Sequence, residues 1–399
     1  MHCTRKLAQD IYWVGADDRR LEKFENLFPI PRGVSYNSYL ILDEKTVLLD
    51  SADETVGRTF EANVEHLLEG RPLDYLIIQH MEPDHAACIV RMAQLYPEMK
   101  LLGSAQAGAM LKQFFPLDLS SRFEAVKEGD ILATGNHTLS FIAAPMVHWP
   151  EVLMTYDMAT QTLFSADAFG TFGALNGHIF ADEVNFDRDW LDDARRYYAN
   201  IVGKYGGPVQ AVLKKAASLQ ISMIAPLHGP VWRQDLEYIL HKYDLWSRCQ
   251  PETQGVVICY GSMYGNTANA ANALACRLGE AGVKDLAVYD LSTTHLSTIM
   301  GEIWRASTLV IASPTYNGGL YPPVEALLND MKALAVQNRR VALIENGSWA
   351  PASGRMMRSA LEGLKNVTLL ESGLTIRSAL QESASEQMEA LVKEILAGL

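Results

Sequence analysis

Apolar and polar residues follow two different patterns along this chain. In the first part, short apolar runs alternate with amphipathic stretches, a pattern that predicts short strands mixed with helices. We expect strands over residues 12–14, 38–42, 46–50, 75–78 and 101–103, and helices over residues 55–68 and 105–114. This mixture of elements suits a four-layer αβ/βα sandwich. The charged stretch 192–198 is predicted to be a solvated helix face.

The pattern changes near residue 253, where apolar strands begin to alternate with helices. Strands are expected over residues 255–260, 309–313 and 341–345, and an alanine-rich helix over residues 268–278. This βαβ alternation predicts a doubly wound parallel sheet that is covered on both faces. The stretch 249–255 is a polar connector. We therefore predict two α/β domains, residues 1–250 and residues 251–399, since 399 residues exceed one usual core.

Four potential metal ligands occupy six positions directly after the predicted strand 75–78. They are His80, Glu82, Asp84 and His85. Residues two apart on an extended segment point to the same side, so His80, Glu82 and Asp84 are expected to converge, with His85 turning in from the next loop or helix start. An exposed acidic turn is the simpler alternative. It is disfavoured because ligand-type residues alternate regularly right behind a strand.

Three further ligand-type residues each follow a strand-like run. His148 comes after residues 139–145, Asp167 after 162–166 and His228 after 221–226. Each of them alone would more simply be a hydrogen-bonded structural residue. Together with the first motif they provide four histidines and three carboxylates, enough donors for two metal ions. Asp167 is the natural candidate to bridge the two ions.

The loop after strand 255–260 has the composition of a phosphate cradle. Small and polar residues lead from this strand into the next helix, and their amides, two hydroxyls and the positive helix end favour an anion. The Gly-Lys-Ser/Thr ending of nucleoside-triphosphate loops is missing, as is the dinucleotide glycine fingerprint. The loop resembles the phosphate loop of flavodoxins, with tyrosine replacing the middle threonine of their consensus. Its candidate cofactor-binding residues are Ser262, Met263, Tyr264, Gly265, Asn266 and Thr267.

Two later loops support flavin mononucleotide (FMN) as the ligand, since they follow the strands 309–313 and 341–345. Open parallel sheets bind ligands at the carboxyl ends of their strands. Trp349 is expected to stack on the isoalloxazine ring, although alone it would be read as a packing residue. The candidate residues in these loops are Pro314, Thr315, Tyr316, Asn317, Gly318, Gly319, Asn346, Gly347, Ser348 and Trp349.

The metal-ligand pattern resembles that of the flavodiiron proteins, or A-type flavoproteins, over essentially the whole chain. This resemblance implies a metallo-β-lactamase-like domain, a flavodoxin-like domain, two irons per chain and FMN. It implies that the first ion is held by His80, Glu82 and His148 and the second by Asp84, His85 and His228, with Asp167 bridging. The residues to which it gives catalytic roles are Asp167, His85 and Glu82.

Glu82 bears on which metal is bound. Zinc hydrolases of the same superfamily carry histidine at this position, which gives a nitrogen-rich pocket suited to zinc-bound hydroxide. An additional carboxylate favours a harder metal that cycles between divalent and trivalent states, so iron is expected. The alternative function is a zinc-dependent hydrolase with an accessory flavodoxin-like domain. A further alternative is an electron carrier that uses the flavin alone.

The expected activity is reduction of dioxygen to water, of nitric oxide to nitrous oxide, or of both. A reduced flavin delivers two electrons and a ferrous pair two more, the four electrons that convert dioxygen to two waters. Substrate preference depends on residues around the pocket, for which Tyr264, His178 and Tyr316 are candidates; His178 is more simply structural. The resemblance also implies a head-to-tail homodimer or a dimer of dimers, in which the flavin of one subunit approaches the irons of the other.

Composition restricts the partners. With 47 acidic and 34 basic residues the formal net charge is −13, which disfavours nucleic acid and anionic membranes. The five cysteines form no CxxC pair, so an internal rubredoxin is excluded and a cytoplasmic location is expected. Electrons must then come from an external donor, such as rubredoxin or a reduced soluble cofactor. The candidate basic residues for receiving an acidic donor are Arg19, Arg20, Lys23, Lys214 and Lys215.

Overall fold

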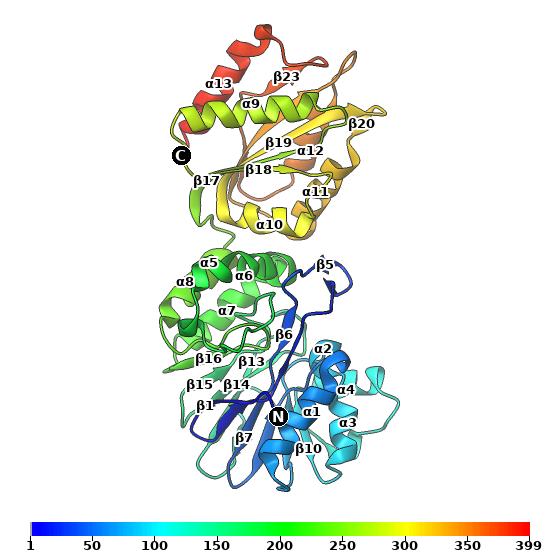
Figure 1. Ribbon diagram of the computed structural model, residues 1–399, viewed down its shortest axis with the longest axis vertical. Coiled ribbons are helices and arrows are strands. Elements are labelled where there is room, and N and C mark those ends of the chain that lie inside the picture. Colours follow the sequence, from blue (N-terminus) through cyan, green and yellow to red (C-terminus); the bar gives the residue numbers. More distant parts are fainter. Residues whose placement is uncertain (1) are drawn as a thin grey trace. The chain divides into compact units, whose positions relative to one another are not determined.

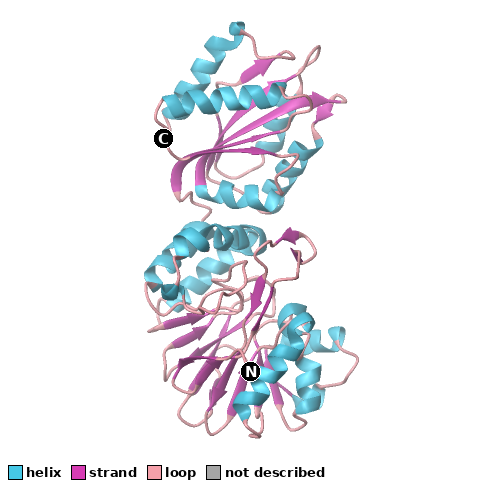
Figure 2. Cartoon of the chain, viewed as in Figure 1, coloured by secondary structure: helices cyan, strands magenta, loops and turns pink. Residues whose placement is uncertain are grey.

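The computed structural model describes residues 2–399, which form two compact units (Figures 1 and 2). The first unit comprises the chain up to Tyr197 together with Gly207–Asp244. The second unit comprises Tyr198–Gly206 and Leu245–Leu399. The sequence predicted the domain boundary near residue 250. In the structure, the second unit begins a few residues earlier, at Leu245, and also includes residues 198–206.

A seven-stranded mixed sheet forms one layer of the first unit. Its strands β8 to β11 run parallel, whereas β1, β2, β7 and β8 pair antiparallel in that order. The strands are β1 (Arg5–Ala8), β2 (Ile11–Trp13), β7 (Tyr39–Leu42), β8 (Thr46–Leu49), β9 (Tyr75–Ile78), β10 (Lys100–Gly103) and β11 (Phe123–Ala125). The predicted strands of this region are therefore confirmed to within a residue or two at their ends.

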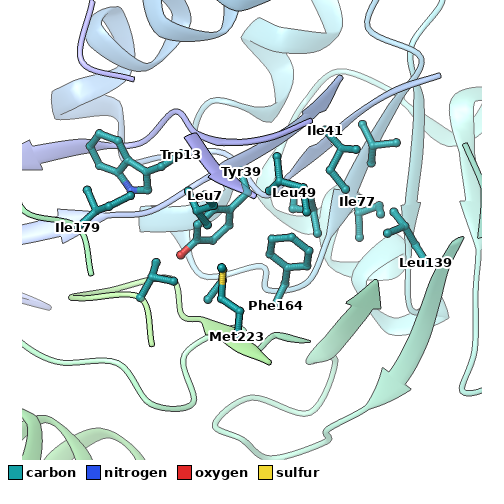
Figure 3. Close-up of a cluster of buried hydrophobic side chains, with 14 of the residues drawn as sticks. Leu7, Trp13, Tyr39, Ile41, Leu49, Ile77, Leu139, Phe164, Ile179 and Met223 are labelled. Atoms are coloured by element: carbon teal, nitrogen blue, oxygen red, sulfur yellow. The ribbon is translucent and has the colours of Figure 1, made fainter. Parts of the chain in front are cut away.

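A five-stranded sheet forms the second layer, in the order β12-β13-β14-β15-β16. Its strands are β12 (Ile131–Ala133), β13 (Thr138–Ala143), β14 (Leu153–Asp157), β15 (Thr162–Phe164) and β16 (Met223–Ala225). Apolar side chains from both sheets form one buried cluster, in which Tyr39 and Ile77 of the first sheet lie beside Phe164 of the second (Figure 3). The two sheets thus pack face to face, as a sandwich requires.

Helices cover the sandwich, and local sequence signals fix their ends. Helix α4 begins after Ser104, whose hydroxyl accepts a hydrogen bond from the Ala107 amide, and α1 ends at Glu69 in the left-handed conformation. The helices are α1 (Gly57–Leu68), α2 (Pro83–Ala86), α3 (Ile89–Leu95), α4 (Ala105–Phe114), α5 (Phe186–Asp189), α6 (Leu191–Tyr197), α7 (Gly206–Ala216) and α8 (Leu236–Ser247). Two short strand pairs complete the unit, β3 (Ala16–Asp18) with β6 (Val34–Tyr36) and β4 (Lys23–Phe24) with β5 (Phe28–Pro29).

The second unit is a parallel sheet with helices on both faces (Figure 1). Its order, β18-β17-β19-β21 and then β22 and β23, is the flavodoxin-like 2-1-3-4-5 arrangement. The strands are β17 (Thr253–Tyr260), β18 (Leu286–Asp290), β19 (Ala306–Tyr316), β20 (Gly319–Leu320), β21 (Arg339–Asn346), β22 (Val367–Leu369) and β23 (Leu374–Ile376). The helices are α9 (Asn266–Glu280), α10 (Leu296–Arg305), α11 (Pro322–Ala333), α12 (Ser353–Leu361) and α13 (Ser385–Leu396). The predicted fold class is confirmed for both units.

Two local expectations were wrong. Asp84 is not on an extended segment, because Pro83 starts the short helix α2 and its fixed φ favours the first helical position. The stretch 192–198 is not a solvated face, since Arg195, Arg196 and Tyr197 are all buried. Charged residues normally mark a solvated helix face, but here the arginine stems and Tyr197 pack inward.

Candidate metal centre and flavin pocket

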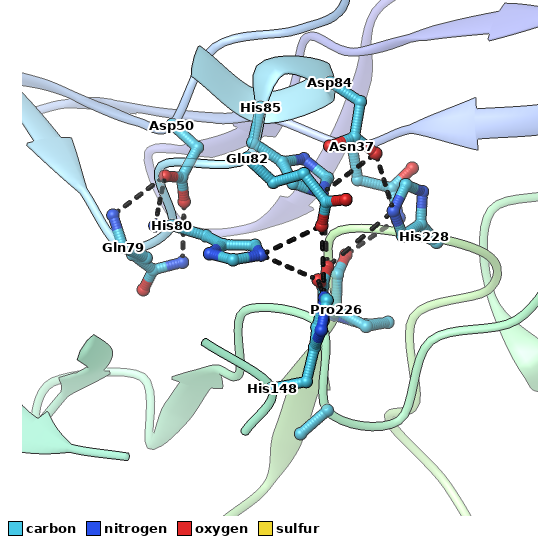
Figure 4. Close-up of polar contacts among 12 residues, drawn as sticks. Asn37, Asp50, Gln79, His80, Glu82, Asp84, His85, His148, Pro226 and His228 are labelled. Carbon is cyan, nitrogen blue, oxygen red and sulfur yellow. Dashed lines mark hydrogen bonds and ion pairs between the residues drawn. The ribbon is translucent and has the colours of Figure 1, made fainter. Parts of the chain in front are cut away.

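All seven predicted ligand residues lie together at one edge of the sandwich. Figure 4 labels all of them except Asp167. His80 and Glu82 follow β9, Asp84 and His85 lie on α2, and the other three follow strands of the second sheet. The strands end at a common edge, which is why residues far apart in sequence meet there. The structure divides the seven into two groups of close ligand atoms, His80, Glu82, His148 and Asp167 in one and Asp84, His85 and His228 in the other.

In the first group, two imidazoles and two carboxylates converge. Glu82 Oε2 lies 3.2 Å from His80 Nε2 and 3.1 Å from His148 Nε2. Asp167 Oδ2 lies 3.2 Å from each of the same two nitrogens. Ligand atoms bound at right angles about 2.1 Å from one ion are about 3.0 Å apart, so these separations fit a single metal ion.

In the second group, Asp84 Oδ2 lies 3.4 Å from His85 Nε2 and 3.2 Å from His228 Nε2. The other oxygen of Asp167, Oδ1, faces this group at 3.1 Å from His85 Nε2 and 3.7 Å from His228 Nε2. Within residues 2–399, no group donates a hydrogen bond to either oxygen of Asp84 or Asp167 by geometry. Buried carboxylates without hydrogen-bond donors are suited to binding cations. Asp167 faces both groups of ligand atoms.

Electrostatics agrees with a site built for positive charge. Burial disfavours the imidazolium form of His85, yet the charges of Asp84 and Asp167 raise the pKa of His85 to about 9. Burial disfavours the imidazolium form of His148 as well, but Asp167 Oδ2 and Glu82 Oε2, which lie next to His148 Nε2, raise the pKa of His148 to about 9. Burial opposes ionisation of Asp167, but His85 and His80 hold its pKa well below the ordinary value. The carboxylates therefore attract cations strongly here.

Outer contacts orient two of the histidines, His80 and His228. His80 Nδ1 lies 2.8 Å from Glu151 Oε1, and His228 Nδ1 lies 2.7 Å from the carbonyl oxygen of Ser35. Donation from Nδ1 leaves Nε2 with a free lone pair directed at the metal position. Asp50, at the end of β8, accepts hydrogen bonds from the amides of Gln79 and His80 at 2.8 and 3.2 Å.

Asn37 fixes the loop that carries His228 (Figure 4). Its side-chain amide donates to the carbonyl oxygens of Pro226 and Gly229, both at 2.8 Å, and its own oxygen accepts from Trp13 Nε1 at 2.9 Å. The Asn37 side chain is fully buried, so its amide needs these partners. The contact holds the His228 loop against β2 and the segment before β7.

The second unit contains a cavity of about 430 Å³ at the carboxyl ends of its parallel strands. Fourteen of the sixteen predicted cofactor-binding residues line it; Gly265 and Gly319 do not, and Ala350 and Ser378 were not predicted. Tyr264 and Trp349 are 92% and 88% exposed at its rim, where an aromatic ligand would cover them. This size and lining fit FMN.

The phosphate end of the cavity depends on backbone geometry. Gly265 stands directly before the 15-residue helix α9 and has φ +90°, a conformation that glycine adopts easily. Its amide donates to Ser262 Oγ at 3.1 Å, and Asn346 Nδ2 donates to Thr267 Oγ1 at 3.2 Å. No lysine or arginine lines the cavity within residues 2–399, so the helix end and hydroxyls would hold the phosphate.

Sequence reasoning missed several residues near the metal centre. Asp50 directly follows β8, so the same rule was able to find it, whereas Glu151 lies before the start of β14 and has no such signal. Tyr197 was assigned to a solvated helix face, but its ring lies 5.7 Å from that of His228. Glu25 is on a turn that no local pattern connects with the site, and burial and the charge of Glu82 raise its pKa to about 8. His178 lies elsewhere, half-exposed with Nδ1 3.7 Å from Glu183.

Comparisons with known proteins agree with this geometry. Residues 34–229 match the ODP family of β-lactamase-like domains, and residues 258–391 match flavodoxin. A nitric oxide reductase of Moorella thermoacetica is 31% identical over 374 residues, which cover 93% of this chain and 92% of that protein. The chain belongs to the flavodiiron protein family. An anaerobic nitric oxide reductase flavorubredoxin of Pectobacterium atrosepticum is 32% identical, over 87% of this chain and 68% of its own length.

Solved flavodiiron structures have the same fold. The rubredoxin oxygen:oxidoreductase of Desulfovibrio gigas superposes with a TM-score of 0.91 at 27% identity, covering 99% of this chain and 98% of that one. The flavodiiron protein of Giardia intestinalis gives 0.92 at 25% identity, covering 99% and 97%. As a flavodiiron protein the chain is an oxidoreductase whose cofactors are FMN and a pair of irons. Among residues 2–399, every helix is too short or too polar to cross a membrane.

Proposed function

We propose that this flavodiiron protein reduces dioxygen to water, nitric oxide to nitrous oxide, or both. The observation that carries the proposal is the position of Asp167, whose two oxygens face two separate groups of ligand atoms. When bound, the irons would supply binding and reduction of the diatomic molecule, and FMN would supply electrons. The names of the relatives, which include both nitric oxide and oxygen reductases, support the same two substrates.

The proposed first ion takes its ligands from the group around Glu82 and the second from the group around Asp84. Asp167 bridges them, and together with Glu82 and His85 it is the residue most directly involved in catalysis. The ligands of the first ion are His80, Glu82 and His148, and those of the second are Asp84, His85 and His228. Tyr197, whose hydroxyl has no hydrogen-bond partner within residues 2–399, is close enough to His228 to limit the room around the second ion.

The zinc hydrolase alternative is less well supported. A hydrolase of this fold needs a nitrogen-rich pocket that activates water, whereas Glu82 places a third carboxylate between His80 and His148. A hydrolase also has no use for a flavin cavity with exposed aromatic residues at its rim. The flavin-only electron carrier has no use for seven converging ligands.

In the second unit we propose that the loops at the strand ends bind FMN. The turn from Ser262 to Thr267 would hold the phosphate, and Trp349 would stack on the isoalloxazine ring. The remaining proposed contacts come from the two later loops, Pro314–Gly319 and Asn346–Ser348.

Partners outside the chain follow from the family. We propose a separate electron donor, such as rubredoxin or a reduced soluble cofactor, and a head-to-tail homodimer or a dimer of dimers. The five cysteines are free thiols, which supports a reducing cytoplasm. Light scattering on the fully active protein tests the assembly, because an active monomer contradicts the dimer.

The test of the activity is the reaction of reduced protein with each gas in turn. Anaerobically reduced protein should be reoxidised by dioxygen or by nitric oxide within seconds, followed by the return of flavin absorbance. Asp167→Ala should abolish turnover and lower the iron content while FMN stays bound. Asp118→Ala, which removes an exposed carboxylate, is the control. Full activity in Asp167→Ala, or two tightly bound zinc ions in the active protein, contradicts the proposal.

A further inference from the structure

Thr267 places a buried hydroxyl group in the wall of the flavin cavity. It is the second residue of α9 and is only 2% exposed. Its Oγ1 accepts a hydrogen bond from Asn346 Nδ2 at 3.2 Å. Within residues 2–399, no carbonyl or carboxylate oxygen accepts the hydrogen of this hydroxyl. A buried donor without a protein acceptor needs a partner from outside the chain.

The backbone of Ser378 fixes which way round the Asn346 side chain lies. Asn346 Oδ1 accepts from the Ser378 amide at 3.1 Å, and Nδ2 donates to the Ser378 carbonyl at 3.0 Å. Exchanging the two amide atoms would set donor against donor and acceptor against acceptor. One hydrogen of Nδ2 is thus used by Ser378, and the other is directed at Thr267. Since this nitrogen offers no lone pair, the Thr267 hydroxyl accepts from it and donates elsewhere.

Asn346 joins three segments of the second unit. It ends β21 and pairs with Ile376 of β23, and its side chain is 7% exposed. Ser378 has φ +66°, in the left-handed region that a residue with a side chain seldom adopts. The two hydrogen bonds with Asn346 hold it there, where it lines the cavity. The same amide therefore couples the loop after β23 to the start of α9.

The described wall of the cavity is polar but carries no charge. Among residues 2–399, none of those lining it is a lysine, an arginine or a histidine. A phosphate monoester carries about two negative charges at pH 7. When only neutral groups hold such an anion, the direction of each donor matters, because a hydroxyl that donates to the protein gives the anion no hydrogen bond. Asn346 keeps the Thr267 hydrogen available.

We propose that Asn346 is a positioning residue for the flavin phosphate. By donating to Thr267 it directs the hydroxyl hydrogen of that residue at the phosphate, and the site thereby selects a phosphorylated flavin over an unphosphorylated one. This inference rests on the proposed FMN site of the second unit. Because Asn346 acts on the phosphate through Thr267, its effect should disappear once Thr267 has no hydroxyl group.

The first test compares FMN with riboflavin, which lacks the phosphate. Both are titrated into flavin-free protein, and the flavin fluorescence gives the two dissociation constants. Thr267→Val and Asn346→Ala should each weaken FMN binding roughly tenfold and leave riboflavin binding unchanged. Asn329→Ala, at an exposed position of α11, is the control and should change neither constant. Equal losses for both flavins would place the role of Asn346 away from the phosphate and overturn the inference.

The second test is the double variant. If Asn346 works by orienting Thr267, the variant with both Thr267→Val and Asn346→Ala should bind FMN as weakly as Thr267→Val alone. If the two losses multiply instead, Asn346 acts independently of Thr267 and the inference is wrong.

Asn346→Asp guards against loss of the fold, which circular dichroism follows. The aspartate keeps the shape of the side chain and an acceptor for the Ser378 amide, but its carboxylate cannot donate to Thr267. It should lose at least as much FMN affinity as Asn346→Ala and retain riboflavin affinity. Wild-type protein that binds FMN no better than the two Asn346 variants overturns this inference alone. Wild-type protein that binds neither flavin overturns the proposed FMN site as well.

Discussion

At the scale of the residue, the two ring nitrogens of His80 have different partners. One ring nitrogen of His80 faces Glu82 and Asp167, and the other lies 2.8 Å from Glu151. Glu151 is itself 1% exposed and also accepts the amide of Met81 at 2.9 Å. The protein thus fixes the ring before any ion arrives, which lowers the cost of binding one.

Replacing Glu151 should therefore weaken the metal centre without touching a ligand. Glu151→Gln removes the charge that supports Nδ1–H of His80, so we expect iron affinity to fall roughly tenfold to a hundredfold. Competition with a ferrous chelator measures it. Glu124→Gln, at an exposed position, is the control and should behave as wild type. Equal iron affinity in both variants would mean that Glu151 does not support His80.

Trp349 permits a similar test in the flavin pocket. It is almost fully exposed, so Trp349→Ala should not destabilise the fold but should remove its stacking on FMN. Loss of one aromatic pair is worth about 1 kcal/mol, or several-fold in affinity. Fluorescence titration of flavin-free protein measures the change, with Met158→Ala as an exposed control. An unaltered dissociation constant would assign Trp349 to another role.

At the scale of the element, the rule that ligands follow strands was predictive. His80, His148, Asp167 and His228 all stand after strands of the two sheets, because hydrophobic runs mark buried strands and strand ends meet at one edge. The rule did not predict the conformation after Pro83, because the local pattern is compatible with both an extended segment and a helical turn, and the structure has a helix there.

The remaining site residues had no local signal. Ser378 lines the flavin cavity but follows β23, which pairs with β21 about 30 residues earlier. The ring of Phe24 lies 5.4 Å from that of His228, which is 204 positions later in the sequence. Such contacts depend on tertiary packing, which periodicity along one segment does not encode.

A buried ion pair connects three strands of the second sheet and makes stability depend on pH. His137, between β12 and β13, has Nδ1 2.9 Å from Asp157 Oδ2 at the end of β14. The hydrogen bond to Asp157 raises the pKa of His137 above 6.5. A raised histidine pKa adds stability that is complete below about pH 6.5 and is lost as pH rises through the folded-state value.

His137→Gln should therefore lower the free energy of unfolding most near pH 5.5 and least at alkaline pH, above the folded-state pKa of His137. The difference should also shrink in strong acid, where Asp157 takes up a proton. Urea titrations at these pH values measure it. His241→Gln, at an exposed site, is the control substitution. A pH-independent difference for His137→Gln would contradict the role of the ion pair.

At the scale of the whole molecule, the second unit includes more than the sequence pattern indicated. The segment Tyr198–Gly206 belongs to it by contact, and Asn200 Nδ2 donates to the Ser297 carbonyl at 3.0 Å. Trp304, fully buried, donates its indole N–H to the carbonyl of Trp246 at 3.1 Å. The domain boundary at residue 250 stays a prediction.

Fragments test that boundary. A fragment of residues 251–399 lacks Trp246 and exposes the Trp304 face of α10, so we expect it to bind FMN but to unfold at lower urea than a fragment of residues 245–399. Flavin fluorescence and circular dichroism measure the two midpoints. Equal midpoints would show that residue 250 is an adequate boundary and that Trp246 adds little.

The two-sided placement of Asp167 has a consequence for how the centre acquires its metal. With one ion absent, the imidazoles of the empty group can compensate Asp167 only by taking up a proton next to the cation that remains. We therefore expect half-filled chains to be the least stable of the three loading states. A preparation that averages one iron per chain should then be a mixture of full and empty molecules.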